Sequence, residues 1–285
     1  MGRAALGSGR LDAAISLLTE TVDDSTDPNG WGYRCRIPLT TALAMRGLTA
    51  EAAARLGALE KLRHPSWRYL DYEYAIARAW LAAGQGAISE AIAVSLAAAE
   101  TARSNGQFAP EVMCLQTATQ FGERSCGPRL RELAAIVEGP RAGLAARFAE
   151  ALHDDDGAEL AAVSAEFEDM GDLIAAVDAA AHAALAYRHK DLRGSALGCS
   201  AKAEALAEQC GARTATLRKA VERLPLTDRE REIVMLIGQG LSNRDIATRL
   251  TLSVRTVENH IYKAMAKTGT SNRDELAGLL PSRRE

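Results

Sequence analysis

Several residues whose side chains could contact a nucleic acid lie between positions 244 and 267. Asn259 carries an amide that can bridge N6 and N7 of adenine, and Glu258 carries a carboxylate that can accept a hydrogen bond from N4 of cytosine. Lysine and arginine side chains of the same stretch can bind backbone phosphates. The candidate contacts are Arg244, Arg255, Thr256, Glu258, Asn259, Tyr262, Lys263 and Lys267.

Side chains with that role need short, rigid helices to hold them, and residues 226–280 carry signals for four helices. A hydroxyl at a helix start can accept hydrogen bonds from backbone N–H groups of the first turn. The predicted caps are Thr227, Ser242, Ser253 and Ser271, and three of them have an acidic residue three positions later, at Glu230, Asp245 and Asp274. Gly240 and Gly269 stand where the first and third helices should end. Arg229 and Glu230 are expected to form a local ion pair.

Apolar residues of this stretch recur every three or four positions, as on one face of a helix. They are Ile233, Leu236, Ile237, Ile246, Leu250, Val257, Ile261 and Met265. Only Thr251 and Leu252 separate the second helix from the helix that starts at Ser253. Two short helices joined by so tight a turn indicate a helix-turn-helix, whose second helix fits the major groove of DNA. Val257 and Ile261 are therefore expected to pack inward.

The same stretch resembles the LuxR-type (NarL/FixJ-like) DNA-binding domain over its whole length, about a fifth of the chain. The matching residues are Leu226-Thr227, Arg229-Glu230, Gly240, Ser242-Asn243, Ile246-Ala247, Leu250 and Thr256-Val257…His260. The resemblance implies a four-helix domain whose third helix reads DNA and whose fourth helix pairs with a second copy. It also implies that Thr256 bonds a phosphate and that His260 packs within the domain. Many members of the family have a lysine in place of Glu258, so a base preference cannot be carried over.

The chain from Leu6 to Leu217 is rich in alanine and poor in β-branched runs, which favours helices over strands. This composition excludes the receiver domain of phosphorylation-controlled regulators and the α/β ligand pocket of quorum-sensing regulators, because both need strands. Expected turn glycines recur at spacings of 38, 39, 41 and 44 residues, at Gly9, Gly47, Gly86, Gly127 and Gly171. Such periods indicate stacked helical hairpins. The segment 79–102 resembles a tetratricopeptide repeat, and an irregular Ala-rich bundle is the alternative.

These signals predict an all-α protein in three parts. Residues 1–217 form a tetratricopeptide-like helical-hairpin repeat domain, residues 218–224 a linker, and residues 225–285 a LuxR-type helix-turn-helix domain. The segment Asp23–Gly32 is expected to be a loop. Leu224 is expected to end the linker, because a residue before a proline is disfavoured in a helix.

Residues 161–213 carry a second resemblance, to the region before the DNA-binding domain in large ATP-binding LuxR-type regulators. The chain has no G-x-x-x-x-G-K-[ST] sequence that could cradle a phosphate. We therefore expect either a short relative of those regulators or the C-terminal portion of a longer protein.

The net charge of −3 excludes a basic protein that coats nucleic acids. Residues 225–285 hold 10 Lys and Arg against 8 Asp and Glu, a balance that predicts a few salt-sensitive phosphate contacts.

Five scattered cysteines without a CxxC pair indicate reduced thiols in a cytoplasmic protein. The run His153–Gly157 is interpreted as a loop and not as a metal site. No catalytic, metal or cofactor site is predicted, so the protein is not expected to be an enzyme. The aromatic stretch from Trp67 to Trp80 is expected to pack in the core, with a ligand groove as the alternative.

The sequence therefore predicts a DNA-binding transcriptional regulator that binds double-stranded DNA as a homodimer. Its helical repeat domain is expected to control DNA binding in response to a protein or a small molecule. The alternative is a protein-interaction scaffold in which the C-terminal module serves mainly self-association. The overall acidity and Glu258 support this alternative.

Overall fold

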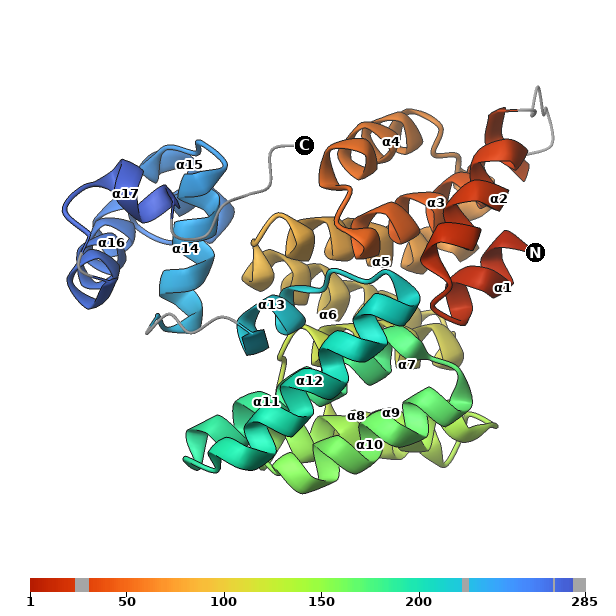
Figure 1. Cartoon of the computed structure of the whole chain (residues 1–285). Coiled ribbons are helices and arrows are strands. Elements are labelled where there is room, and N and C mark those ends of the chain that lie inside the picture. Colours follow the sequence, from red (N-terminus) through yellow and green to blue (C-terminus); the bar gives the residue numbers. More distant parts are fainter. Residues whose placement is uncertain (24–30, 222–225, 269, 279–285) are drawn as a thin grey trace.

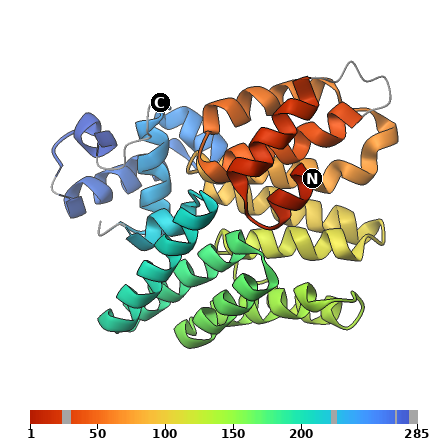
Figure 2. The same cartoon turned by 45° about the vertical axis from the view of Figure 1, so that its right-hand side comes forward.

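The computed structural model describes residues 1–23, 31–221, 226–268 and 270–278. Every regular element in these ranges is a helix, which confirms the all-α fold class. The first helices stack into a curved array, red to green in Figure 1, and the blue C-terminal helices lie beside it. Figure 2 shows the same arrangement after a turn of the molecule. We call α1–α13 the N-terminal helical region and α14–α17 the C-terminal module.

The helices of the N-terminal helical region are α1 (Gly2–Gly7), α2 (Leu11–Asp23), α3 (Trp31–Arg46), α4 (Thr49–Lys61), the 3-10 helix η1 (Pro65–Leu70), α5 (Asp71–Gly84), α6 (Ile88–Ser104), α7 (Phe108–Gln120), α8 (Gly127–Ala134), α9 (Pro140–His153), α10 (Gly157–Met170), α11 (Leu173–His189), α12 (Arg193–Cys210) and α13 (Ala215–Val221). Consecutive helices pack as hairpins, among them α2 with α3, α5 with α6, α8 with α9 and α10 with α11. The hairpin architecture is confirmed, and its tetratricopeptide type stays a prediction.

Glycines in the left-handed conformation join several of these helices. Four of the five predicted turn glycines have positive φ, namely Gly9 (69°), Gly47 (86°), Gly86 (86°) and Gly171 (85°). The prediction was wrong for Gly127, which is the first residue of α8. In that turn Gly122 takes the left-handed conformation, with φ at 102°. The helix begins at Gly127 because Pro128 suits the first turn of a helix.

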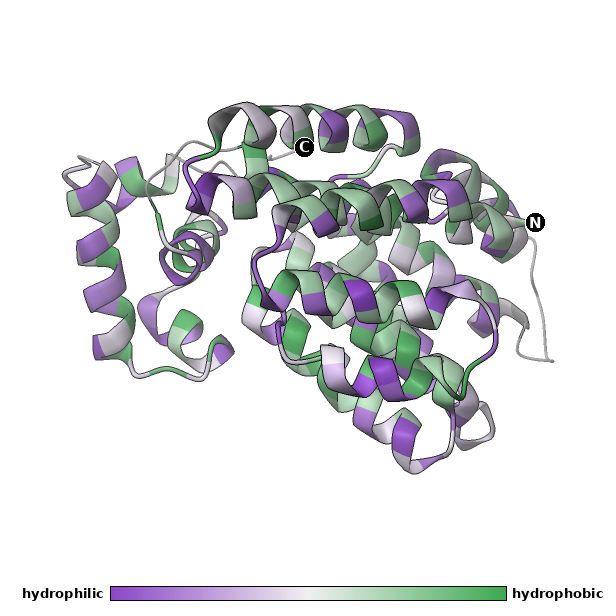
Figure 3. Ribbon diagram, turned by 90° about the horizontal axis from the view of Figure 1, so that it is seen from below, coloured by the Kyte–Doolittle hydropathy of each residue, from purple (hydrophilic) through white to green (hydrophobic). Residues whose placement is uncertain are grey.

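Alanine allows the helices of the N-terminal helical region to lie close together. In α11, Ala175, Ala179 and Ala183 recur every fourth residue and are all 0% exposed. The larger core residues include Trp80, whose ring meets the edge of Phe121 with 4.9 Å between the ring centres. Figure 3 shows hydrophobic residues along the faces at which the helices meet.

The aromatic stretch from Trp67 to Trp80 packs mainly into the core, as predicted. Tyr74 and Trp80 are buried, and Trp67 stacks on Tyr33 with ring centres 5.0 Å apart. Tyr69 is the exception, at 49% exposed.

The C-terminal module contains α14 (Asp228–Gly238), α15 (Asn243–Arg249), α16 (Val254–Thr268) and α17 (Arg273–Gly278). Three predicted caps are confirmed. Thr227 and Ser242 each form a complete capping box, with Glu230 and Asp245 respectively. Ser253 Oγ accepts a hydrogen bond from the N–H group of Thr256 at 3.1 Å. Gly240 follows α14 with φ at 83°, as expected for a glycine that ends a helix, whereas Gly269 lies outside the described residues.

Two local predictions in the module were wrong. The cap of α17 is Asn272 and not Ser271, because the Asn272 amide oxygen accepts from the N–H group of Glu275 at 2.9 Å. Glu275 in turn accepts from the Ser271 N–H group at 2.7 Å, so the box is shifted by one residue and Asp274 has no part in it. Arg229 and Glu230 do not pair either. Their side chains point to different partners, described below.

The predicted boundaries meet the structure only in part. The first residues of the predicted linker 218–224 belong to α13, while Leu224 and Pro225 lie outside the described residues. Residues 24–30 of the expected loop Asp23–Gly32 also lie outside them. The division into domains therefore stays a prediction. Within the run His153–Gly157, the loop comprises residues 154–156, because His153 ends α9 and Gly157 begins α10. Asp156 caps α10, since it accepts from the N–H groups of Ala158 and Glu159 at 3.0 and 3.2 Å. No helix in the described ranges has the length and apolar character needed to cross a membrane.

Candidate nucleic-acid interface

Helix α16 packs on α14 and α15 through its apolar side. Val257 and Ala264 are both 0% exposed, which confirms the inward position predicted for Val257. Ile261 and Met265 are half-buried against the same hydrophobic cluster. This packing fixes the rotation of α16 about its axis and directs its opposite, polar face to solvent.

The polar face of α16 is open along its length. Arg255, Glu258, Asn259, Tyr262 and Lys263 are all exposed. Their positions repeat at three or four residues, so the structure brings all five to one side of the helix. The major groove of DNA is wide enough to admit an α-helix, and this face could then contact the base edges. Tyr262 is 76% exposed although its ring is large and partly apolar. Its position therefore contributes little to the stability of the fold.

The beginning of α16 carries the features of an anion site as well as a cap. Thr256 is half-buried, and its hydroxyl lies 2.7 Å from that of Ser253. Backbone N–H groups and the helix dipole favour a negative group at such an end. Arg244, on the neighbouring α15, is exposed. The phosphate contacts assigned to Thr256, Arg244 and Arg255 stay predictions.

Lys267 has a partner inside the module that the sequence did not reveal. Its ammonium group donates to both carboxylate oxygens of Glu230, at 2.7 and 3.0 Å. The Glu230 side chain is only 3% exposed and also closes the capping box of α14. Although burial acts to raise it, the hydrogen bonds from Lys267 and Thr227 hold the pKa of Glu230 below its usual value. Lys267 therefore ties the end of α16 to the start of α14, and its predicted contact with DNA is untested.

His260 and Arg273 support the module from within. His260 is half-buried on α16, and burial lowers the pKa of its imidazole, so that the ring is neutral at pH 7. Arg273 donates to the Asn243 side chain at 2.5 Å and to the Leu241 carbonyl at 2.6 Å. These bonds hold α17 against the turn between α14 and α15.

The side of α14 that faces away from the module core contacts the N-terminal helical region, at the turn between α5 and α6. Glu232 accepts hydrogen bonds there from the backbone N–H group of Ser89 at 2.7 Å and from its hydroxyl at 3.0 Å. The N-terminus of α6 has no side-chain cap of its own, so this carboxylate completes it. Arg229 pairs with Glu232 at 2.7 Å, which explains why it does not pair with Glu230.

A second set of bonds surrounds this cap. Arg249 donates to Glu90 at 2.8 Å and to the side chain of Gln85 at 2.7 Å, and the Gln239 amide donates to the Gln85 carbonyl. Gly86 approaches so closely that a Cβ added to it would lie 2.7 Å from Cβ of Met235. We call this set the docking contact: Gln85, Gly86, Ser89 and Glu90 on one side, with Arg229, Glu232, Met235, Gln239 and Arg249 on the other. Because it uses α14 and α15, it leaves the polar face of α16 uncovered.

Two capped helices, a tight turn and an open polar face define the C-terminal module as a helix-turn-helix DNA-binding domain. Residues 224–280 match the family model described as "Bacterial regulatory proteins, luxR family". The chain thus carries a LuxR-type helix-turn-helix domain at its C-terminus, behind an all-helical N-terminal region.

Curated relatives match part of the chain. The response regulator Rre1 of Synechocystis sp. is 44% identical over 54 residues, 19% of this chain and 23% of the relative. A putative HTH-type transcriptional regulator of Mycobacterium bovis is 49% identical over 51 residues, 18% of this chain and 6% of the relative. The DNA-binding transcriptional activator DevR/DosR of Mycobacterium tuberculosis is 34% identical over 113 residues, 36% of this chain and 52% of the relative. The chain thus spans about half of these relatives' length at most, and no solved structure matches it.

Proposed function

We propose that the protein is a transcriptional regulator that binds double-stranded DNA in a sequence-specific manner through α16. The observation that carries this proposal is the open face formed by Arg255, Glu258, Asn259, Tyr262 and Lys263 on a helix whose other side is locked into the domain. The family match and the names of the relatives support it.

The regulator acts as a homodimer. One reading helix contacts only a few base pairs, so useful specificity needs two copies on half-sites about one helical turn apart. By its resemblance to the family, α17 contributes the surface that pairs. The N-terminal helical region controls the DNA-binding domain, and the docking contact supports this role because it joins the two directly.

Selection of bound DNA from a random pool, followed by gel-shift titration of the selected site, tests the proposal. Asn259→Ala should weaken binding to the selected site by about 1–3 kcal/mol, with little effect on random DNA, because an amide reads base edges. Lys263→Ala should weaken binding to all sequences and lower the slope of log K against log salt by about 0.9, the value of one phosphate contact. Lys190→Ala, at an exposed lysine beyond the end of α11, is the matched control and should change neither quantity.

If no sequence is enriched at low salt, the protein is not a specific DNA reader, and the scaffold alternative takes its place. If a sequence is enriched but both variants bind it as the wild type does, α16 does not present the reading face assigned to it.

A further inference from the structure

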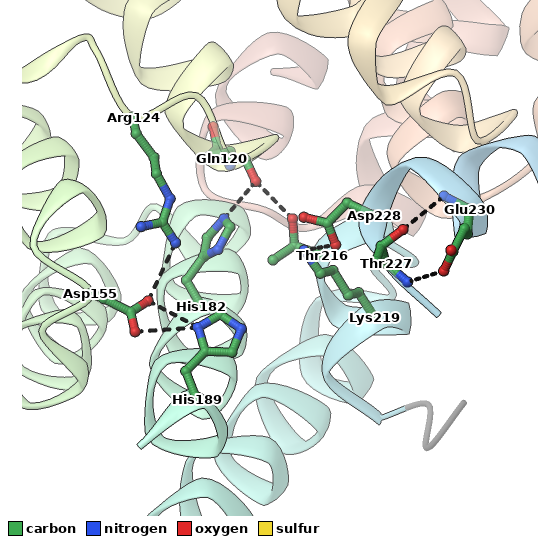
Figure 4. Close-up of polar contacts among 10 residues, drawn as sticks. All are labelled: Gln120, Arg124, Asp155, His182, His189, Thr216, Lys219, Thr227, Asp228 and Glu230. Atoms are coloured by element: carbon green, nitrogen blue, oxygen red, sulfur yellow. Dashed lines mark hydrogen bonds and ion pairs between the residues drawn. The ribbon is translucent and has the colours of Figure 1, made fainter. Parts of the chain in front are cut away.

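A cavity of about 290 Å³ lies under α14, between the C-terminal module and the N-terminal helical region. One face of α14 forms its lid, through Asp228, Arg231, Glu232 and Met235. Arg231 and Glu232 lie three and four residues after Asp228, and Met235 lies three residues after Glu232, as expected for one side of a helix. The opposite walls come from α6, the loop after α7, α11 and α13. Figure 4 shows polar contacts near this space, including those of the wall residues Asp155, His182 and Asp228.

Much of the wall is apolar. Ile88 and Ile92 come from α6, Phe121 follows α7, Leu185 belongs to α11, and Met235 closes the space from α14. The volume corresponds to about ten water molecules at ~30 Å³ each, which is room for a small organic molecule. An apolar wall of this kind favours a ligand with a hydrocarbon body.

Each carboxylate on the wall is already paired with an arginine or a lysine of the protein. Asp155 contacts Arg124 at 3.3 Å and His189 at 3.2 Å. Asp228 pairs with Lys219 of α13, and Glu232 pairs with Arg229 within the docking contact. Arg231 of the lid also has an interaction within the protein. A charged ligand would therefore have to break an existing contact or remain uncompensated in a half-buried space, and both are costly. The cavity therefore favours an uncharged ligand.

One wall residue offers a specific polar contact. His182 is 7% exposed, and burial lowers the pKa of its imidazole to about 4. The neutral ring bonds the carbonyl oxygen of Gln120 through Nε2 at 3.0 Å, and since a carbonyl only accepts, Nε2 carries the proton. Nδ1 is then a hydrogen-bond acceptor. Thr216 donates to the same carbonyl at 2.7 Å, which further fixes this corner of the wall.

We propose that this cavity binds a small uncharged organic molecule with an apolar body and a hydroxyl or N–H donor, which His182 Nδ1 accepts. Because the walls come from both sides of the docking contact, the ligand binds the docked arrangement and stabilises it. The inference deepens the proposed control of DNA binding and rests on it for its biological meaning. Binding to the cavity is measured without DNA, so a failure here is distinguishable from a failure of the proposed function.

The test uses the full chain and two probes of similar size. 2-Naphthol is uncharged and carries one hydroxyl donor, whereas 2-naphthoate is an anion. Equilibrium dialysis at pH 7 should show one saturable 2-naphthol site per chain, with 2-naphthoate bound at least tenfold more weakly. Ala215→Trp and Ile92→Trp each fill the cavity from a different wall and should weaken 2-naphthol binding at least tenfold. Ala201→Trp makes the same substitution at an exposed position of α12 and should leave it unchanged.

A third variant, Gly86→Ala, places a methyl group against Met235 of the lid, pushes α14 away from the other walls and should also weaken binding. The inference is overturned if 2-naphthol shows no saturable site, if 2-naphthoate binds as tightly, or if the filled variants with a wild-type helical circular dichroism spectrum bind as the wild type does. Unchanged binding in Gly86→Ala would equally overturn a site shared between the two sides.

Discussion

Gly86→Ala is expected to break the docking contact while leaving both sides folded. Gly86 has φ at 86°, where an alanine costs about 1–2 kcal/mol. The new methyl group would lie 2.7 Å from Cβ of Met235, whereas carbon atoms pack at about 3.5–4.0 Å. Helix α14 must therefore move away by roughly 1 Å.

A displacement of that size breaks the bonds around Gly86. The bonds from Ser89 to Glu232 measure 2.7 and 3.0 Å, so an added ångström takes them beyond hydrogen-bond distance. Bonds to a charged group contribute about 1.5–3 kcal/mol each at most, and exposed ones less. We expect docking to weaken by about 2–4 kcal/mol, a change of roughly 30- to 700-fold in the docked population.

Gly106→Ala is the matched control. Gly106 also has positive φ, at 67°, but an added Cβ meets no atom within 4 Å. Both variants therefore carry the same kind of backbone strain, and only one has the clash. Hydrogen exchange followed by mass spectrometry of the segment 85–92 should show much faster exchange in Gly86→Ala and wild-type exchange in Gly106→Ala. Equal protection of this segment in both variants would refute the docking contact.

Two further predictions concern stability, each measured by urea unfolding. Burial raises the pKa of Asp178 to about 7, so between about pH 4 and pH 7 the folded protein holds a proton that the unfolded chain has lost. The free energy of unfolding therefore decreases as pH rises through this range, by at most about 1.4 kcal/mol per pH unit. Asp178→Asn should abolish this decrease, and an unchanged pH profile would count against it. The variant should also expose the opposite trend of His182, whose pKa of about 4 makes stability fall as pH drops below its unfolded value near 6.5. Lys267→Met should destabilise the C-terminal module by about 1–3 kcal/mol, because the buried carboxylate of Glu230 loses its cation. That loss should shrink at low pH, where Glu230 is protonated, and a constant difference from pH 7 to pH 3 would contradict the pairing.

Local features of the C-terminal module could be predicted from the sequence because they depend on neighbours in the chain. The caps at Thr227, Ser242 and Ser253 involve residues three positions apart. The same reasoning misplaced the last cap, since Ser271 and Asn272 are both good cap residues and the nearby glutamate decides between them. The inward position of Val257 could be predicted because apolar residues recur every three or four positions along α16. Asn259 lies on the opposite side of the same helix and is therefore exposed.

Long-range pairing could not be predicted in the same way. Glu232 and Ser89 are 143 positions apart, and nothing in either local sequence identifies the other as its partner. The same holds for Lys267, which looks like a surface lysine until α16 is placed beside α14. Gly86 did give a signal, because its place in the glycine period predicted a turn. Its second role, close approach to Met235, depends on the arrangement of the two sides of the docking contact.

The carboxylate that finishes the first turn of α6 belongs to a different part of the chain, and this restricts how the protein can be rebuilt. A chimaera that carries a foreign LuxR-type reader in place of residues 226–278 would leave the Ser89 amide without its acceptor unless the donor supplies an acid at the position of Glu232. Grafts should therefore be chosen by that one residue as well as by the operator they read. A donor with a carboxylate there should restore the cap of α6 and dock as the native module does, and one without it should dock more weakly.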